Sequence, residues 1–119
     1  MKPSRDTIQP YVTKDGSLIR ELLHPSLHGN RSLSLAEAIV APGAATVLHR
    51  HHRAEEVYHV LAGSGCMTLG GERFLLAPGD TVSIAPGQPH RVENNGSVPL
   101  RILCCCAPAY AHDDTELIL

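Results

Sequence analysis

The chain has few of the side chains that bind nucleic acid. Among its 119 residues there is no tryptophan, one phenylalanine and three tyrosines, and the ten lysines and arginines form no cluster and leave a formal net charge of −2. Proteins that bind DNA or RNA usually neutralise phosphates with a basic patch or stack bases on aromatic rings. Because the sequence offers neither, we expect no nucleic-acid partner.

Long apolar segments are also missing. No run reaches the roughly 20 residues that a membrane-spanning helix needs, and residues 1–16 lack the apolar region of a secretory signal. We therefore expect a cytoplasmic protein with no membrane partner. The length suits one domain, which we place at residues 17–119, after an N-terminal arm over residues 1–16.

The four cysteines form no Cys-x-x-Cys pair. Cys66 stands alone, and Cys104, Cys105 and Cys106 are consecutive. Neighbouring residues of a strand point to opposite faces, so the three consecutive cysteines pair badly with one another. We expect all four to fill a β core as small apolar side chains. A role as a thiolate ligand or nucleophile is the alternative.

What the sequence does contain is turn residues at short intervals. Glycine, proline and asparagine separate short pieces that are rich in valine, isoleucine, leucine and threonine. This pattern is typical of an all-β sandwich or barrel. The acidic tail fits either a last short helix or a strand. The other expected elements are strands over residues 17–22, 80–85 and 99–106 and a hairpin over residues 68–73, with Gly70-Gly71 in its turn.

A histidine-rich segment, "LHRHHRAEEVYHVLAG" at residues 48–63, raises the question of function. On a helix, His49, His52 and Glu56 would share one face. On a strand, His49 and His51 would point the same way, and Glu56 would come from the next strand. Turn residues on both sides and the β-branched stretch "EVYHVL" favour strands.

A second segment, residues 79–94, supplies His90 after a Pro86-Gly87 turn. By itself His90 would be an ordinary structural histidine. Together with His49, His51 and Glu56 it completes three imidazoles and one carboxylate, a set that suits a first-row transition metal and leaves open coordination positions.

These residues resemble the two motifs of the cupin superfamily, and in particular its small single-domain members. The first motif runs Gly, five residues, His-x-His, three or four residues, Glu, six residues, Gly. It is matched here by Gly43, His49, His51, Glu56 and Gly63. The spacing to the closing glycine selects Glu56 rather than its neighbour.

The second cupin motif runs Gly, five residues, Pro-x-Gly, two residues, His, three residues, Asn. Gly79, Gly87, His90 and Asn94 match it, whereas Ala85 stands at the proline position. This departure concerns the geometry of the turn and leaves the ligands in place. Both motifs together, in the correct order, make a strong resemblance.

The resemblance implies an antiparallel jelly-roll barrel (a double-stranded β-helix, RmlC-like) with a metal site inside. It implies that His49, His51, Glu56 and His90 bind one divalent transition metal, either iron, manganese, nickel, cobalt or zinc. It also implies a homodimer, since cupins often pair through N-terminal strands. The alternative is a metal-free, vestigial pocket.

Three kinds of function fit this expectation. The first is a metal-dependent enzyme acting on a small polar or aromatic molecule, of isomerase, decarboxylase or dioxygenase type, with Tyr58 as a candidate catalytic residue. The second is a non-catalytic module that binds a sugar, an organic acid or the metal itself. The third is a structural or storage protein. We favour the enzyme, although a shared fold does not transfer a reaction and Tyr58 could equally be a buried structural residue.

Overall fold

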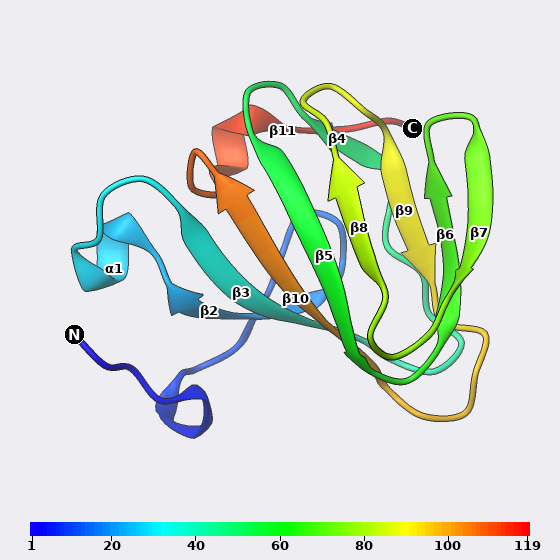
Figure 1. Ribbon diagram of the computed structural model, residues 1–119, viewed down its shortest axis with the longest axis horizontal. Coiled ribbons are helices and arrows are strands. Elements are labelled where there is room, and N and C mark those ends of the chain that lie inside the picture. The colour runs from blue at the N-terminus through cyan, green and yellow to red at the C-terminus, as the bar shows by residue number, and fades with distance from the viewer.

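Eleven antiparallel strands form two sheets that pack face to face (Figure 1). The computed structural model describes all residues from Met1 to Leu119. The first sheet has the order β1-β2-β3-β10-β5-β8, and Figure 1 shows β2, β3, β10, β5 and β8 side by side. The second has the order β11-β4-β9-β6-β7. This is the all-β jelly roll that the sequence predicts.

The strands are short, as the closely spaced turn residues indicate. The first sheet contains β1 (Tyr11–Val12), β2 (Leu18–Leu23), β3 (Ser34–Val40), β5 (Glu55–Ala62), β8 (Thr81–Ile84) and β10 (Leu100–Ala107). The second contains β4 (His49–His51), β6 (Gly65–Leu69), β7 (Glu72–Leu76), β9 (His90–Glu93) and β11 (Thr115–Leu117). The helical segments are η1 (Arg5–Thr7), α1 (Pro25–His28) and η2 (His112–Asp114).

Alternation along the strands builds the core. In β10, Leu100, Ile102, Cys104 and Cys106 are buried, while the residues between them are partly exposed. The apolar core draws on the facing sides of both sheets, with members such as Val60 and Met67 almost fully buried. Burial of such a two-sided apolar layer drives the packing of the sheets.

The expected elements occur close to their predicted positions. The hairpin β6–β7 turns through Gly70, whose φ of 57° is a left-handed conformation that glycine adopts without strain. The tail forms both of the alternatives, first η2 and then β11. The prediction that the cysteines are small buried side chains is confirmed for Cys66, Cys104 and Cys106 and wrong for Cys105, which is partly exposed because it points to the outer face of β10; all four are free.

The first sixteen residues, which we expected to be an arm, carry β1 and the turn into β2. Tyr11 is opposite Ile19, so β1 extends the first sheet at its edge. Further upstream, the guanidinium of Arg5 donates to the carboxylate of Glu37 on β3 at 2.9 Å. The chain therefore lies against the sheet from residue 5 onward.

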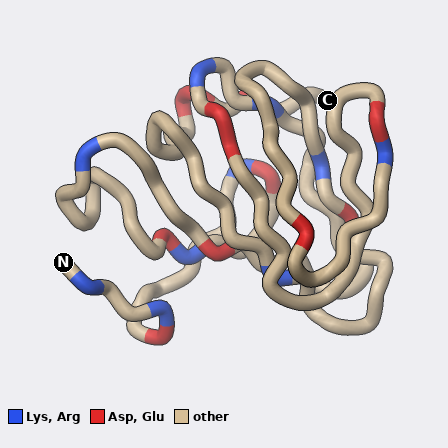
Figure 2. Tube along the Cα trace, in the orientation of Figure 1, with Lys and Arg blue, Asp and Glu red and all other residues tan.

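Charges of both signs are spread around the trace, and no continuous basic stripe follows any strand (Figure 2). None of the helices is long and apolar enough to span a membrane. The homodimer and the cytoplasmic location expected from the sequence stay predictions.

Candidate metal centre

The histidine-rich segment forms the short strand β4, as the strand interpretation predicts, and β4 presents two histidines to the interior. His49 and His51 are buried, whereas Arg50 between them points outward and pairs with Glu116 on β11. His49 lies directly opposite His90 on β9. The antiparallel pairing therefore brings together residues that are 41 positions apart in the sequence (90 − 49).

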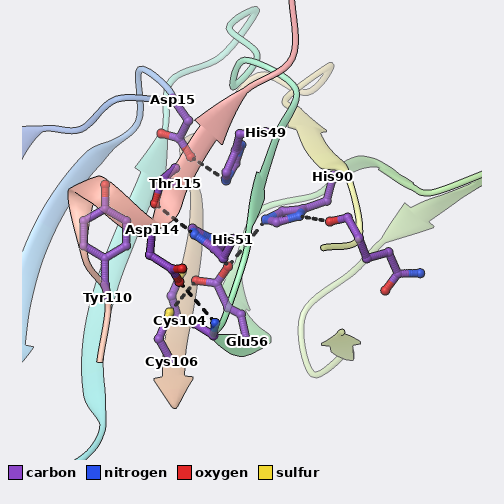
Figure 3. Close-up of polar contacts among 12 residues, drawn as sticks. Asp15, His49, His51, Glu56, His90, Cys104, Cys106, Tyr110, Asp114 and Thr115 are labelled. Atoms are coloured by element: carbon purple, nitrogen blue, oxygen red, sulfur yellow. Dashed lines mark hydrogen bonds and ion pairs between the residues drawn. The ribbon is translucent and has the colours of Figure 1, made fainter. Parts of the chain in front are cut away.

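One ring nitrogen from each of His49, His51 and His90 lies within 4.8 Å of the others, so the cluster could hold a metal ion. Figure 3 shows the three rings around a common space. A metal-bound imidazole must offer an unprotonated nitrogen to the ion. The hydrogen-bond partner of the other ring nitrogen, Nδ1, therefore decides whether each histidine can bind a metal through Nε2.

All three Nδ1 atoms have partners that fix the proton. His49 Nδ1 donates to the backbone oxygen of Val47 at 2.7 Å, and His90 Nδ1 donates to that of Gln88 at 2.9 Å. A carbonyl oxygen only accepts, so each Nδ1 carries the proton and each Nε2 keeps its lone pair.

His51 reaches the same state through a hydroxyl. Its Nδ1 lies 3.0 Å from Thr115 Oγ1, and that hydroxyl already donates to the oxygen of Ala111 at 3.0 Å. Thr115 must therefore accept from His51 Nδ1. In its neutral form His51, like the other two histidines, therefore keeps its lone pair on Nε2, which lies 3.1 Å from Glu56 Oε1 and would share a proton with it when no metal is bound.

The carboxylate of Glu56 completes the centre from the other sheet. Its Oε1 lies 3.1 Å from His51 Nε2 and 3.5 Å from His90 Nε2. Burial alone would raise the pKa of Glu56, but the hydrogen bond to His51 and the positive charge of His51 and His90, when these two are protonated, outweigh it and lower the pKa to about 2. The carboxylate is thus ionised and needs a cation, either a proton shared with the imidazoles or a metal ion.

The donor set fits a divalent transition metal. His90 Nε2 is buried and has no hydrogen-bond partner, although an unpaired buried polar atom is costly. Burial, followed by the charge of His90, lowers the pKa of His49, so this imidazole is neutral at neutral pH. Neutral imidazoles and an ionised carboxylate are the forms that ligate iron, manganese, nickel, cobalt or zinc. That these four residues act as ligands stays a prediction.

Two groups in contact with the centre escaped the sequence analysis. Asp15 Oδ2 lies 3.5 Å from His49 Nε2 (Figure 3), while its Oδ1 accepts from Thr13 Oγ1 at 2.9 Å and from the Ser17 amide at 2.9 Å. The thiol of Cys106 donates to Glu56 Oε2 at 3.1 Å. The only sequence signal for Asp15 is an ordinary Asp-Gly turn, and for Cys106 it is the inward parity of a β10 residue.

Tyr58, the candidate catalytic residue, follows Glu56 by two positions on β5 and faces the same interior. Its ring stands edge-on to that of His90, with the centroids 5.8 Å apart. Burial raises the pKa of the Tyr58 phenol well above its ordinary value, so the group stays protonated. Its catalytic role is not tested by the structure.

The centre opens into a cavity with about 580 Å³ of empty space, part of it open to solvent. Small side chains of β3 and β10 belong to its lining, together with tyrosines and further acidic groups. The polar and aromatic lining residues outside the histidine cluster include Tyr11, Thr13, Asp15, Glu21 and Tyr110, of which Asp15 and Tyr110 contact the histidines themselves. The cavity thus gives solvent access to the histidine cluster and presents polar and aromatic side chains beside it.

Comparison with known families settles the family. A model of the cupin domain matches residues 36–106. The chain is a cupin. Over 118 residues this cupin is 53% identical to the protein MJ1618 of Methanocaldococcus jannaschii, covering 99% of the chain and 94% of that protein. It is also 32% identical over 108 residues to the tetracenomycin polyketide synthase protein TcmJ of Streptomyces glaucescens, covering 87% of the chain and 72% of that protein.

Among solved structures, the cupin is similar to the polyketide cyclase RemF of Streptomyces resistomycificus. The TM-score is 0.85 at 21% identity, and the match covers 100% of the chain and 85% of RemF. At this level of identity the likeness supports the fold alone.

Proposed function

We propose that this cupin is a metal-dependent enzyme that acts on a small polar or aromatic molecule bound in the cavity. The observation that carries the proposal is the convergence of three imidazole Nε2 atoms and the ionised Glu56 carboxylate beside an open cavity, which His49, His51 and Glu56 line. A divalent metal held there would polarise a substrate carbonyl or stabilise an enolate. Such a centre would serve the isomerase, decarboxylase and dioxygenase types expected from the sequence.

The chain's own groups support acid–base work beside the centre. Asp15 Oδ2 has no hydrogen-bond donor of its own and faces His49, so it can accept a proton or a hydrogen bond from a molecule bound there. Tyr58, protonated and edge-on to His90, can donate to an oxygen of the same molecule. Neither role requires a further residue from outside the cavity.

One relative suggests which molecules to test first. TcmJ, which shares 32% identity with this cupin, belongs to a polyketide synthase system. Aromatic ketones and their enolisable precursors therefore head the list of candidate substrates, with small hydroxy and keto acids after them.

The first test is metal analysis of protein purified without chelator, on wild type, His51→Ala, His90→Ala and His52→Ala. His52 belongs to the same segment but is exposed, so it serves as the matched control. We expect close to one metal per chain in wild type and His52→Ala and little in the other two, because each loses one of few buried ligands. Full occupancy in His51→Ala would refute the ligand set.

Turnover separates the enzyme from the alternative binding module. Metal-loaded wild type should convert at least one of the aromatic ketones or keto acids, and His90→Ala should not. A metal-loaded protein that binds such molecules without converting any of them would instead be the non-catalytic module.

A further inference from the structure

Glu21 on β2 is a buried carboxyl group that the proposed function does not use. It is 6% exposed and lines the cavity. Its Oε2 accepts a hydrogen bond from the Tyr11 hydroxyl at 2.8 Å, but its Oε1 is buried without any partner. An unpaired buried carboxylate oxygen costs free energy, which a ligand that donates to it would recover.

A second unpaired atom lies in the same part of the cavity. The hydroxyl of Tyr110 is buried and has no hydrogen-bond partner. Its ring stands edge-on to that of His51 at 5.9 Å between centroids (Figure 3), so Tyr110 connects the histidine side of the cavity with the Glu21 side. Burial raises the pKa of Glu21 and outweighs the lowering by the Tyr11 hydrogen bond and by the charges of His24 and His28, so this carboxyl is a stronger hydrogen-bond acceptor than an exposed one.

The sheet register shows how Glu21 stands relative to the metal centre. Glu21 is opposite Ala36 on β3, Ala36 is opposite Cys104 on β10, and Cys104 is opposite Tyr58 on β5. At about 4.8 Å between strands, this row extends about 14 Å from the backbone of β2 to that of β5, the strand of Glu56. Glu21 and Tyr58 therefore stand at the two ends of one row of inward-facing residues, with Ala36 and Cys104 between them.

The floor between them is built from small side chains. Ser34, Ala36 and Ala38 of β3 and Cys104 and Cys106 of β10 all line the cavity. Larger residues at these inward positions would fill the space. A floor of small, mostly apolar side chains, with carboxyl groups toward its two ends, fits a flat molecule with a hydrogen-bonding group at each end.

We propose that Glu21, held by Tyr11, is the second anchoring point of the cavity and accepts a hydrogen bond from a phenolic hydroxyl at the end of the ligand remote from the histidines. This inference rests on the proposed function and narrows its substrate class to flat hydroxylated aromatic ketones. The carbonyl end lies at the histidine cluster, the ring system covers the floor, and the hydroxyl reaches Glu21 Oε1.

A matched pair of ligands tests the proposal. 6-Hydroxy-1-tetralone and 1-tetralone share one flat bicyclic ketone and differ only in the remote hydroxyl. Calorimetric binding to the metal-loaded protein should favour the hydroxylated ketone by tenfold or more, the usual effect of a hydrogen bond to a charged group. Glu21→Leu should abolish this preference by weakening only the hydroxylated ketone, and the exposed control Glu72→Leu should keep it.

A purely structural role gives a different result. If Glu21 only supported the fold, Glu21→Leu would weaken the binding of both ketones equally, and this would overturn the proposal. Equal affinity of wild type for the two ketones, or no binding of either, would also overturn it. Tyr11→Phe is a second variant in case Glu21→Leu does not fold. Tyr11 is partly exposed, and its substitution removes only the hydrogen bond to Glu21 Oε2. This variant should show a smaller preference for the hydroxylated ketone than wild type.

Metal content separates this inference from the proposed function. Glu21→Leu should keep the metal that His51→Ala loses, because Glu21 does not contact the histidines. Metal-loaded wild type without a preference for the hydroxyl would refute the role of Glu21 alone. Wild type without metal would refute the proposed function, while the hydroxyl preference could still be measured.

Discussion

At the scale of single residues, the candidate metal centre depends on which ring nitrogen of each histidine carries the proton. Each imidazole donates a hydrogen bond from Nδ1 to an acceptor outside the cluster. Two of these acceptors are backbone oxygens, and the third is the hydroxyl of Thr115. These acceptors fix both the tautomer and the orientation of the rings. The backbone acceptors cannot be removed by substitution, but the hydroxyl of Thr115 can.

Thr115→Val tests this contribution. Valine has nearly the shape of threonine but cannot accept from His51 Nδ1, so the ring loses its fixed tautomer. We expect the affinity for Zn²⁺, measured by competition with a chelator of known affinity, to fall about 10- to 100-fold.

The control for this substitution is Thr81→Val. Thr81 Oγ1 lies 2.8 Å from His59 Nδ1, which is the same kind of contact on the protein surface. Thr81→Val should leave the affinity unchanged. Equal affinities of all three proteins would show that Thr115 does not position His51.

How much of the centre could be predicted also depends on single residues. Strand alternation within two short segments, together with the resemblance to the cupin motifs, predicted that His49, His51, Glu56 and His90 lie together, as they do in the structure. Asp15 could not be predicted in this way, because no local pattern in the sequence relates it to His49. That contact depends on the pairing of Asp15 and Val47 backbones, whose N···O distance is 2.8 Å.

At the scale of elements, the turn residues predicted most strands, and the burial pattern confirmed their faces. Elements that depend on distant contacts were less accessible. The tail could be predicted only as helix or strand, because its strand β11 exists by pairing with β4, about 65 residues upstream (Thr115 opposite His51, 115 − 51 = 64). Local sequence does not encode such a partner.

Glu37 shows how one element holds another. It lies on the outward side of β3, yet only 2% of it is exposed, because Arg5 and Arg101 cover it with hydrogen bonds of 2.9 and 2.8 Å. Burial alone would raise the pKa of Glu37, but these hydrogen bonds outweigh it and lower the pKa below the ordinary 4.5. The ionised carboxylate thus ties η1 to the first sheet.

Glu37→Gln should lower the free energy of unfolding at pH 7 by about 1–3 kcal/mol, since the hydrogen bonds to a charged group are weakened. Because the pKa of Glu37 is lower in the folded state than its unfolded value of 4.5, the ionised carboxylate stabilises the fold fully at pH values above 4.5. This stabilisation is lost as the pH falls through the folded-state pKa. Urea unfolding should therefore show a difference from wild type that shrinks below about pH 4.

Glu72→Gln, on the exposed start of β7, is the control for Glu37→Gln and should match wild type at each pH. A difference between Glu37→Gln and wild type that stayed constant down to pH 3 would mean that the charge of Glu37 is not what stabilises the fold.

At the scale of the whole molecule, the candidate centre joins the two sheets. The histidines come from β4 and β9 of the second sheet, and Glu56 comes from β5 of the first. The corner between β4 and β5 is fixed separately, because the Asp114 carboxylate accepts from the amides of Arg53 and Ala54 at 2.9 and 3.1 Å. A metal bound by the four residues would thus link the sheets on the side where they are joined by this corner.

Removing the metal should therefore destabilise the entire fold. A ligand present at a thousand times its dissociation constant stabilises the folded state by about 4 kcal/mol. In a domain of this size that corresponds to a fall in Tm of roughly 10–20 °C when a chelator strips the ion. Scanning calorimetry should show this fall for wild type and for His52→Ala, whereas His51→Ala should already melt at the lower temperature and not respond to chelator. If wild type loaded with metal and wild type treated with chelator melted together, the ion would not link the sheets, and the four residues would have to be satisfied by shared protons alone.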